Sequence, residues 1–217
     1  YFKMADETVS AAESYSERIA VKIRTLELLS VLDMLCLVIL IVIQTLAAMK
    51  MSVLNKLLEQ RAYTDAHTGL PNKDACEVLL NNKETVAKHT ACMMFDLNNL
   101  KIINDTKGHS KGDQLILNFA RLLRNVIPQK DFVGRYGGDE FMVVIYNTSK
   151  TEIEDILKQL SREKDRLNSS GNNMPIDYAC GWAISDADSE CTIQMLLDKA
   201  DYYMYENKQA YKKSKKS

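Results

Sequence analysis

The chain lacks an excess of charge of either sign. Its 28 Lys and Arg residues balance 29 Asp and Glu residues over 217 positions, which leaves a formal net charge of −1. Proteins that bind nucleic acid through the phosphate backbone carry clustered basic charge. The sequence as a whole therefore gives no electrostatic reason to expect DNA or RNA as a partner, and any phosphate binding must be local.

The chain also lacks a cysteine pattern that indicates disulfides or a zinc site. Its five cysteines are odd in number, widely spaced and without a CxxC pair. We expect them to be small buried hydrophobic side chains in a reducing compartment. The chain begins at Tyr1 rather than at a methionine and shows no cleavable signal pattern, which favours the C-terminal piece of a longer protein.

One long apolar stretch, residues 28–49, predicts a membrane span. Its only charge is Asp33, and a helix rising about 1.5 Å per residue must start near Leu28 to cross a hydrocarbon core of about 30 Å. Asp33 then lies little more than a turn inside one face, where a carboxylate can reach water or be protonated. A buried helix of a soluble bundle is the alternative. Basic residues flank both ends of the span, so charge does not choose its orientation.

The segments on either side of this span are predicted to be helical. Residues 1–27 have a mixed-charge helical pattern without glycine or proline, which fits the end of a truncated sensor or extracytoplasmic helix. Residues 50–64 predict a signalling linker helix suited to pairing with its copy in a dimer, because Met51, Leu54, Leu57 and Leu58 follow helical spacing. A turn-forming segment, HTGLPN, then marks the start of a compact domain at 65–217.

Residues 65–217 alternate between helical and strand patterns. We expect helices at 73–84, 111–127, 151–167 and 192–208, and strands at 90–97, 132–136, 140–146 and 176–185. This order predicts an α+β domain in which helices cover a largely antiparallel sheet. The strand at 140–146 is apolar on both faces, so we expect it to be central in the sheet.

Acidic residues stand at the ends of two apolar strands. Gly137 and Gly138 are a two-residue hairpin signal, for which a type I′ turn needs positive φ at both positions. Asp139 and Glu140 follow where the turn meets a buried strand, and desolvated carboxylates there favour a divalent cation. If these two residues are considered without the rest of the sequence, they could equally well be solvent-exposed acids in a turn that binds no cation. Asp96 ends a second apolar strand, and acids from two neighbouring strand ends suit a magnesium site for a nucleoside triphosphate.

The polar run that follows Asp96, residues 98–113, has many features of a phosphate-binding loop. It offers exposed backbone N–H groups, Lys101 and Lys107, two glycines and a helix start after Gly112. His109 lies in this run, and we expect it to be structural rather than a catalytic base. Trp182, the only tryptophan, is predicted to pack within its strand.

Four ordered motifs together resemble the GGDEF family of diguanylate cyclases. GGDEF at 137–141, preceded by Arg135 and Tyr136, matches the family signature, and YTDAHTGLPNK, DLNNLKIINDTKGHSKGD and ADYYMYENK keep the family order over residues 62–212. The resemblance implies a nucleotide-cyclase palm, a ferredoxin-like antiparallel sheet flanked by helices. It also implies that two GTP are joined into cyclic di-GMP with release of two pyrophosphates. Because each domain holds one GTP, two copies must meet as a homodimer.

The resemblance also implies a role for individual residues. Asp96, Asp139 and the backbone carbonyl of Leu97 would bind Mg²⁺ or Mn²⁺. Asp139 and Glu140 would be the catalytic residues, with Glu140 assisting metal binding or deprotonation of the attacking 3′-hydroxyl. The implied substrate contacts are the guanine-reading Asn104 and Asp113, the phosphate-binding amides of Asn99, Leu100 and Lys101, the close-approach glycines Gly137 and Gly138, and Lys208 and Lys212 beside the β- and γ-phosphates. The implied location is the inner (cytoplasmic) membrane, with one span and the catalytic domain in the cytoplasm.

The sequence departs from the family pattern in places that leave Asp96 intact. Asn98 replaces a second acid, Leu100 replaces a phenylalanine, and Lys212 stands where arginine is common. Many relatives bind product through an Arg-x-x-Asp motif before the signature, which reads Pro-Gln-Lys-Asp at 128–131 here. Proline has no guanidinium, so we expect the product-inhibition site to be absent.

Two other functions are alternatives to an active cyclase. One is a catalytically inactive GGDEF domain that binds GTP as a regulatory or dimerisation module, and the other is a purely structural signalling module. The presence of all the metal-binding acids and of the guanine-reading pair opposes both.

Overall fold

The structure, a computed structural model, describes residues 2–82, 85–86, 89–171, 174–185 and 191–214. The chain divides into two compact units, Tyr1–Leu58 and Glu59–Ser217.

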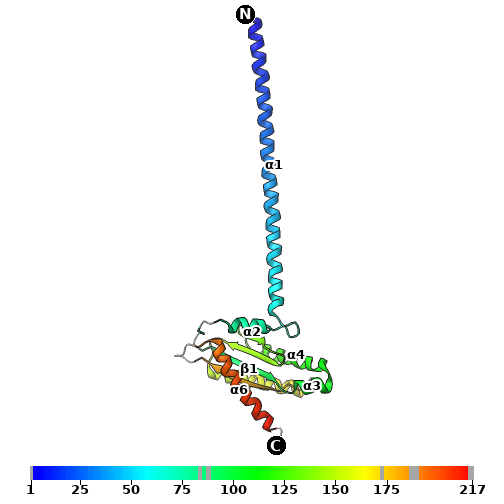
Figure 1. Cartoon of the computed structure of the whole chain (residues 1–217), viewed down its shortest axis with the longest axis vertical. Coiled ribbons are helices and arrows are strands. Elements are labelled where there is room, and N and C mark those ends of the chain that lie inside the picture. The colour runs from blue at the N-terminus through cyan, green and yellow to red at the C-terminus, as the bar shows by residue number, and fades with distance from the viewer. Residues whose placement is uncertain (1, 83–84, 87–88, 172–173, 186–190, 215–217) are drawn as a thin grey trace. The chain divides into compact units, whose positions relative to one another are not determined.

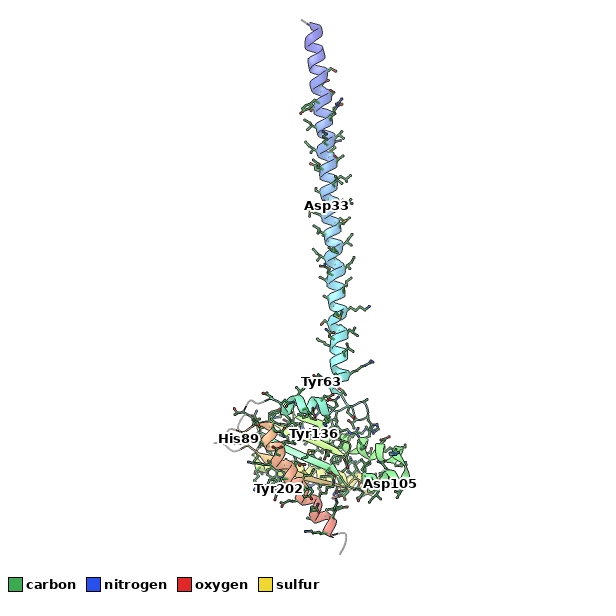
Figure 2. The ribbon with its side chains drawn as sticks, in the orientation of Figure 1. Asp33, Tyr63, His89, Asp105, Tyr136 and Tyr202 are labelled. Atoms are coloured by element: carbon green, nitrogen blue, oxygen red, sulfur yellow. The ribbon has the colours of Figure 1, made fainter. Side chains whose placement is uncertain are left out.

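Helix α1 (Phe2–Tyr63) is one uninterrupted helix that includes the apolar stretch 28–49 (Figure 1). By length and composition it could cross a membrane, and none of its most apolar stretch is buried. Asp33 lies exposed on its side (Figure 2). The segments predicted on either side of the apolar stretch are therefore parts of the same helix, and among the described residues this stretch is not buried as a helix of a soluble bundle would be.

The second unit is a four-stranded antiparallel sheet covered by helices on both faces. Its strands are β1 (Ala91–Leu97), β2 (Phe132–Arg135), β3 (Glu140–Ile145) and β4 (Tyr178–Ile184), in the spatial order β2-β3-β1-β4. Helices α2 (Lys73–Leu80) and α6 (Ile193–Ser214) cover one face, and α6 crosses it in front of β1 in Figure 1. Helices α3 (Leu100–Lys107), α4 (His109–Val126) and α5 (Lys150–Ser169) contribute to the core on the other face. The predicted α+β architecture is confirmed.

The two central strands are buried on both faces. Alternate residues of β3 enter separate cores, with Phe141 and Val143 on the α4 side and Met142 and Val144 on the α6 side. The ring of Phe119 on α4 lies edge-on to Phe141, with centroids 5.1 Å apart. The sheet is therefore fixed from both sides, and the ends of β1 and β3 are held in place where their acidic residues stand.

Several predicted boundaries differ from the structure. Helix α2 ends at Leu80 with Asn81 as its C-cap, and residues 83–84 of the predicted helix lie outside the described residues. Helix α6 continues to Ser214, and β4 is shorter than predicted at both ends. The other strand and helix limits agree to within about two residues.

The run 98–113 is a helix pair rather than a loop. Helix α3 forms because Ile103 packs into the core, and Gly108, at φ +84°, turns the chain directly into α4. The second helix therefore starts at His109 and not after Gly112. Apolar residues in this run are few, so its helical pattern was concealed by the surrounding polar residues.

The hairpin between β2 and β3 is not a type I′ turn. Neither Gly137 nor Gly138 has positive φ, and four residues separate the two strands instead of two. The N–H groups of Tyr136 and Gly137 both donate to the carbonyl of Glu140, at 2.9 and 3.1 Å. A four-residue connection does not require the mirror-image turn, which is why the Gly-Gly signal predicted the wrong geometry.

Candidate functional site

Three acidic side chains meet at neighbouring ends of β1 and β3. Asp96 on β1 is paired in register with Glu140 on β3. Asp139 comes directly before Glu140, and its backbone carbonyl accepts a hydrogen bond from the Leu97 N–H at 2.9 Å. The structure therefore brings together the acids that the sequence assigned to metal binding and catalysis.

The surroundings of these acids disfavour three uncompensated charges. Burial raises the pKa of Asp96, and the negative charge of Asp139 raises it further against the opposing effect of Lys208. Burial also raises the pKa of Glu140, with Asp139 and Asp96 adding to the shift. Oδ1 of Asp96 is buried and accepts no hydrogen bond from the described residues. A cation at this point would satisfy that oxygen and offset the repulsion.

The residues present fit a divalent metal that substrate helps to hold. No group of three His, Cys, Asp or Glu side chains in the described part of the chain could hold a metal by itself. Asp96 and Asp139 supply two carboxylates, and Mg²⁺ commonly binds through one or two carboxylates together with phosphate oxygens and water. This donor set would suit a metal held jointly with a nucleotide better than a metal cage made entirely by protein.

Lys208 reaches this cluster from α6. Its Nζ donates to Oδ2 of Asp96 at 2.5 Å. Gly181 on β4 makes this possible, because a Cβ there would lie 2.1 Å from the Ala200 carbonyl oxygen and prevent α6 from packing so closely. Sequence reasoning placed Lys208 beside phosphates and missed its ion pair with a predicted metal ligand. Lys212 lies one turn further along α6 and is exposed.

The three residues predicted to bind phosphate through their amides lie at the start of α3. Asn99 is the N-cap and has the left-handed conformation, with φ 64°. Leu100 and Lys101 follow in the first turn, and the first backbone hydrogen bond within the helix runs from the Ile103 N–H to the Asn99 carbonyl at 3.0 Å. The N–H groups before Ile103 have no partner within the helix, which gives the helix N-terminus its affinity for anions.

The predicted guanine-reading residues come from the two helices of this pair. Asn104 lies on α3, and its buried Oδ1 has no hydrogen-bond partner among the described residues. Asp113 lies on α4 with an exposed side chain, and its backbone carbonyl oxygen is 3.0 Å from Nε2 of His67. A Cβ at Gly112 would lie 1.9 Å from Oδ1 of Asn104. The absence of a side chain at Gly112 therefore leaves room for the Asn104 side chain, a role that was not predicted from the sequence.

An ion pair holds the signature hairpin against the turn after α1. Nη1 of Arg135 lies 3.2 Å from both carboxylate oxygens of Asp65, and Nη2 donates to the Gly138 carbonyl at 2.9 Å. Burial would raise the pKa of Asp65, but hydrogen bonds from Thr68 and the Arg135 guanidinium lower it overall. Both residues lie in the motifs that resemble the family, but their pairing was not predicted from the sequence.

The segment predicted to lack a product-binding arginine is used in packing. Asp131 is 3% exposed, and its Oδ1 accepts a hydrogen bond from the Tyr146 N–H at 3.1 Å. Its backbone N–H donates to the Pro128 carbonyl at 3.0 Å, which closes a turn. The aspartate of this segment therefore has a structural partner of its own.

The remaining predictions concern cysteines, His109 and Trp182. Cys76, Cys92 and Cys191 are buried as predicted, and Cys180 is partly buried. Cys36 is exposed on α1, so the prediction of a buried side chain is wrong for it. His109 is the exposed first residue of α4, and Trp182 packs against the core as expected.

Comparison with known proteins agrees with this geometry. The sequence profile of the family described as "Diguanylate cyclase, GGDEF domain" matches residues 62–214. The chain is 31% identical over 164 residues to the signaling protein YkoW of Bacillus subtilis, covering 72% of this chain and 20% of that protein. It is 30% identical over 165 residues to the diguanylate cyclase DgcP of Escherichia coli, covering 74% and 48% respectively. The chain thus spans less than half the length of these relatives.

A solved structure has the same fold. It is a microbial GGDEF domain studied for its interaction with cyclic di-GMP, with a TM-score of 0.59 and 27% identity. The match covers 70% of this chain and 94% of that one. With the profile spanning most of the chain and the signature acids gathered at one end of the sheet, the chain belongs to the GGDEF-domain family of diguanylate cyclases.

Proposed function

We propose that the chain is an active diguanylate cyclase that condenses two GTP into cyclic di-GMP and releases two pyrophosphates. The observation that carries this proposal is the convergence of Asp96, Asp139 and Glu140 at the ends of β1 and β3, with Lys208 beside them. A domain that had lost its activity would have no need to keep mutually repelling, partly buried acids together.

Each group has a proposed task in GTP binding. The first turn of α3 would hold phosphates through its free N–H groups, and Lys208 and Lys212 would add positive charge beside them. Lys208 would exchange its contact with Asp96 for one with phosphate when substrate binds. The amide of Asn104 and the carboxylate of Asp113 would bind the guanine edge, since a carboxylate accepts from N1–H and the 2-amino group, which adenine does not offer together.

The proposed chemistry is attack of the 3′-hydroxyl of one GTP on the α-phosphate of the other. Mg²⁺ or Mn²⁺ held by Asp96 and Asp139 would activate that hydroxyl and stabilise the charge on the phosphates. Glu140, whose pKa is raised by burial and by its acidic neighbours, would accept a proton or assist the metal site. No heavy atom lies within 4 Å of the position that a Cβ at Gly138 would occupy. The backbone of the hairpin is therefore open there, and a phosphate could approach it closely.

The reaction needs two domains because each holds one GTP, so we propose a homodimer. The amphipathic part of α1 beyond residue 50 supports this, since Met51, Leu54 and Leu58 are exposed on it. We also propose that residues 28–49 span the inner membrane once, with the catalytic domain in the cytoplasm. Membrane fractions of expressing cells should retain the chain after alkaline carbonate washing, and a chain that begins at Met51 should be released.

The function is tested by incubating the purified full chain with GTP and Mg²⁺ and resolving the products by mass. Cyclic di-GMP formed from GTP, without cyclic di-AMP formed from ATP under the same conditions, supports the proposal. Retention of a non-hydrolysable GTP analogue without any product from GTP would instead indicate the inactive, GTP-binding module. Absence of both binding and product would indicate a purely structural module.

A further inference from the structure

The outer edge of β4 borders a groove that the proposed reaction does not use. The groove has a volume of about 540 Å³ and lies between α5 and α6. Residues 180–184 of β4 form its floor, and its walls carry Lys150, Lys199, Tyr203 and Asn207. Its place in the sheet separates it from the acidic site, because Trp182 is paired with Met93, three residues before Asp96.

The hydrogen-bond register of β4 leaves its backbone unpaired on this side. β1 is the only strand paired with β4 in the described sheet, and the Ser185 N–H donates to the Thr90 carbonyl at 2.8 Å. In an antiparallel ladder every second residue directs its backbone groups toward the same neighbour. Since the Ser185 N–H faces β1, the backbone N–H and C=O groups of Ile184, Trp182 and Cys180 face away from β1. No described residue supplies a backbone partner for them.

The described lining of the groove carries positive charge from both faces of the sheet. Lys150 is the first residue of α5, which packs on one face, and Lys199 belongs to α6, which packs on the other. Both side chains are exposed, and neither forms an ion pair with a described residue. No described aspartate or glutamate lines the groove. The charge therefore favours an anionic occupant.

We propose that the edge of β4 is a docking site for an extended acidic segment of a partner protein, which adds to the sheet as a further strand. Residues 180–184 span roughly 13 Å, a length that a short strand can pair with. Successive side chains of an added strand point to opposite faces, so two adjacent acidic residues would meet Lys150 and Lys199 separately. A second copy of the chain is disfavoured, because it would place its own two lysines against these.

Trp182 makes the docking site directly observable. It is the only tryptophan in the chain and lines the groove, so all tryptophan emission of the full chain comes from this position. The probe is the synthetic heptapeptide Thr-Val-Thr-Glu-Glu-Val-Thr, acetylated and amidated, titrated into the full chain in detergent. We expect a saturable change in Trp182 emission. The same peptide with both glutamates replaced by lysine, or N-methylated at its inner residues, should give none.

Variants separate docking from a general charge effect. Lys150→Glu combined with Lys199→Glu should weaken peptide binding by about tenfold or more, because two favourable charge pairs become repulsive. Arg162→Glu is the matched control, since Arg162 is exposed on α5 outside the groove, and it should leave binding unchanged. Thermal melting checks that each variant is folded.

Three results would overturn the proposal. One is the absence of any saturable change up to millimolar peptide, and another is equal binding by the lysine peptide or by the double variant. The third is a saturable response to ATP, used as a nucleotide probe, without one to the acidic peptide, which would assign the groove to a small phosphorylated ligand. None of these results depends on whether the chain synthesises cyclic di-GMP.

Discussion

Replacing Gly112 with alanine should displace Asn104 and weaken the use of GTP. The added Cβ would lie 1.9 Å from Oδ1 and 2.9 Å from Cγ of Asn104. Ordinary van der Waals contact begins at 3.4 Å, so the amide must retreat by about 1.5 Å or rotate away. Both residues lie on well-packed helices, which leaves the Asn104 side chain as the part most able to move.

Two opposing free energies determine the size of the expected effect. Alanine favours a helix over glycine by about 1 kcal/mol, which offsets part of the strain and keeps the fold stable. Loss of one hydrogen bond to guanine costs about 0.5–1.5 kcal/mol. At about 1.36 kcal/mol for each factor of ten, kcat/KM for GTP should fall roughly 2- to 13-fold, while the melting temperature changes little.

A double-mutant cycle tests the stated cause. Steady-state kinetics of pyrophosphate release are measured for the wild type, Gly112→Ala, Asn104→Ala and the double variant. If Gly112 acts only through Asn104, its replacement should cost almost nothing once Asn104 is alanine. Full additivity of the two losses, or an unchanged kcat/KM in the folded Gly112→Ala variant, would refute the reasoning.

Three further predictions concern other parts of the domain. Asp139→Asn should abolish product formation without lowering the melting temperature, because it removes a charge that repels Asp96 and Glu140; wild-type turnover would contradict the metal assignment. Asp65→Asn should lower the free energy of unfolding by about 1–2 kcal/mol at neutral pH in denaturant titrations, because it removes hydrogen bonds to a charged group. The folded pKa of Asp65 is lowered, so this difference should shrink as the pH falls below the ordinary value of 3.8; a difference that persists in acid would implicate packing instead. Cyclic di-GMP titrated into the active chain should inhibit initial rates weakly or not at all through residues 128–131, and strong non-competitive inhibition lost on changing Asp131 would show that a product site exists there.

The positions of the acids followed from the sequence because strand burial is a local pattern. A run that is apolar on both faces indicates a central strand, and the residues that end such runs must lie at the rim of the sheet. Asp96 and Asp139 are therefore placed without any knowledge of long-range contacts. Their strands were also expected from the sequence to be neighbours in the sheet. The observed pairing of Asp96 with Glu140 confirms this.

Two of the contacts that the sequence did not reveal join distant segments. Lys208 and Asp96 are 112 positions apart, and their ion pair depends on how closely α6 packs over Gly181. The pair of Asp65 and Arg135 likewise spans 70 positions. Helix α3 was missed for another reason, since its eight residues contribute only one buried side chain, Ile103, to its periodicity.

The most direct test of the proposed activity is the stoichiometry of the reaction. Purified full chain is incubated with GTP and Mg²⁺, and pyrophosphate and cyclic di-GMP are quantified in the same samples over a range of protein concentrations, with Asp139→Asn as the blank. Condensation of two GTP across two domains predicts two pyrophosphates for each cyclic di-GMP and a rate per chain that falls on dilution. Release of pyrophosphate without cyclic product, or GTP binding with no release above the blank, would contradict a diguanylate cyclase.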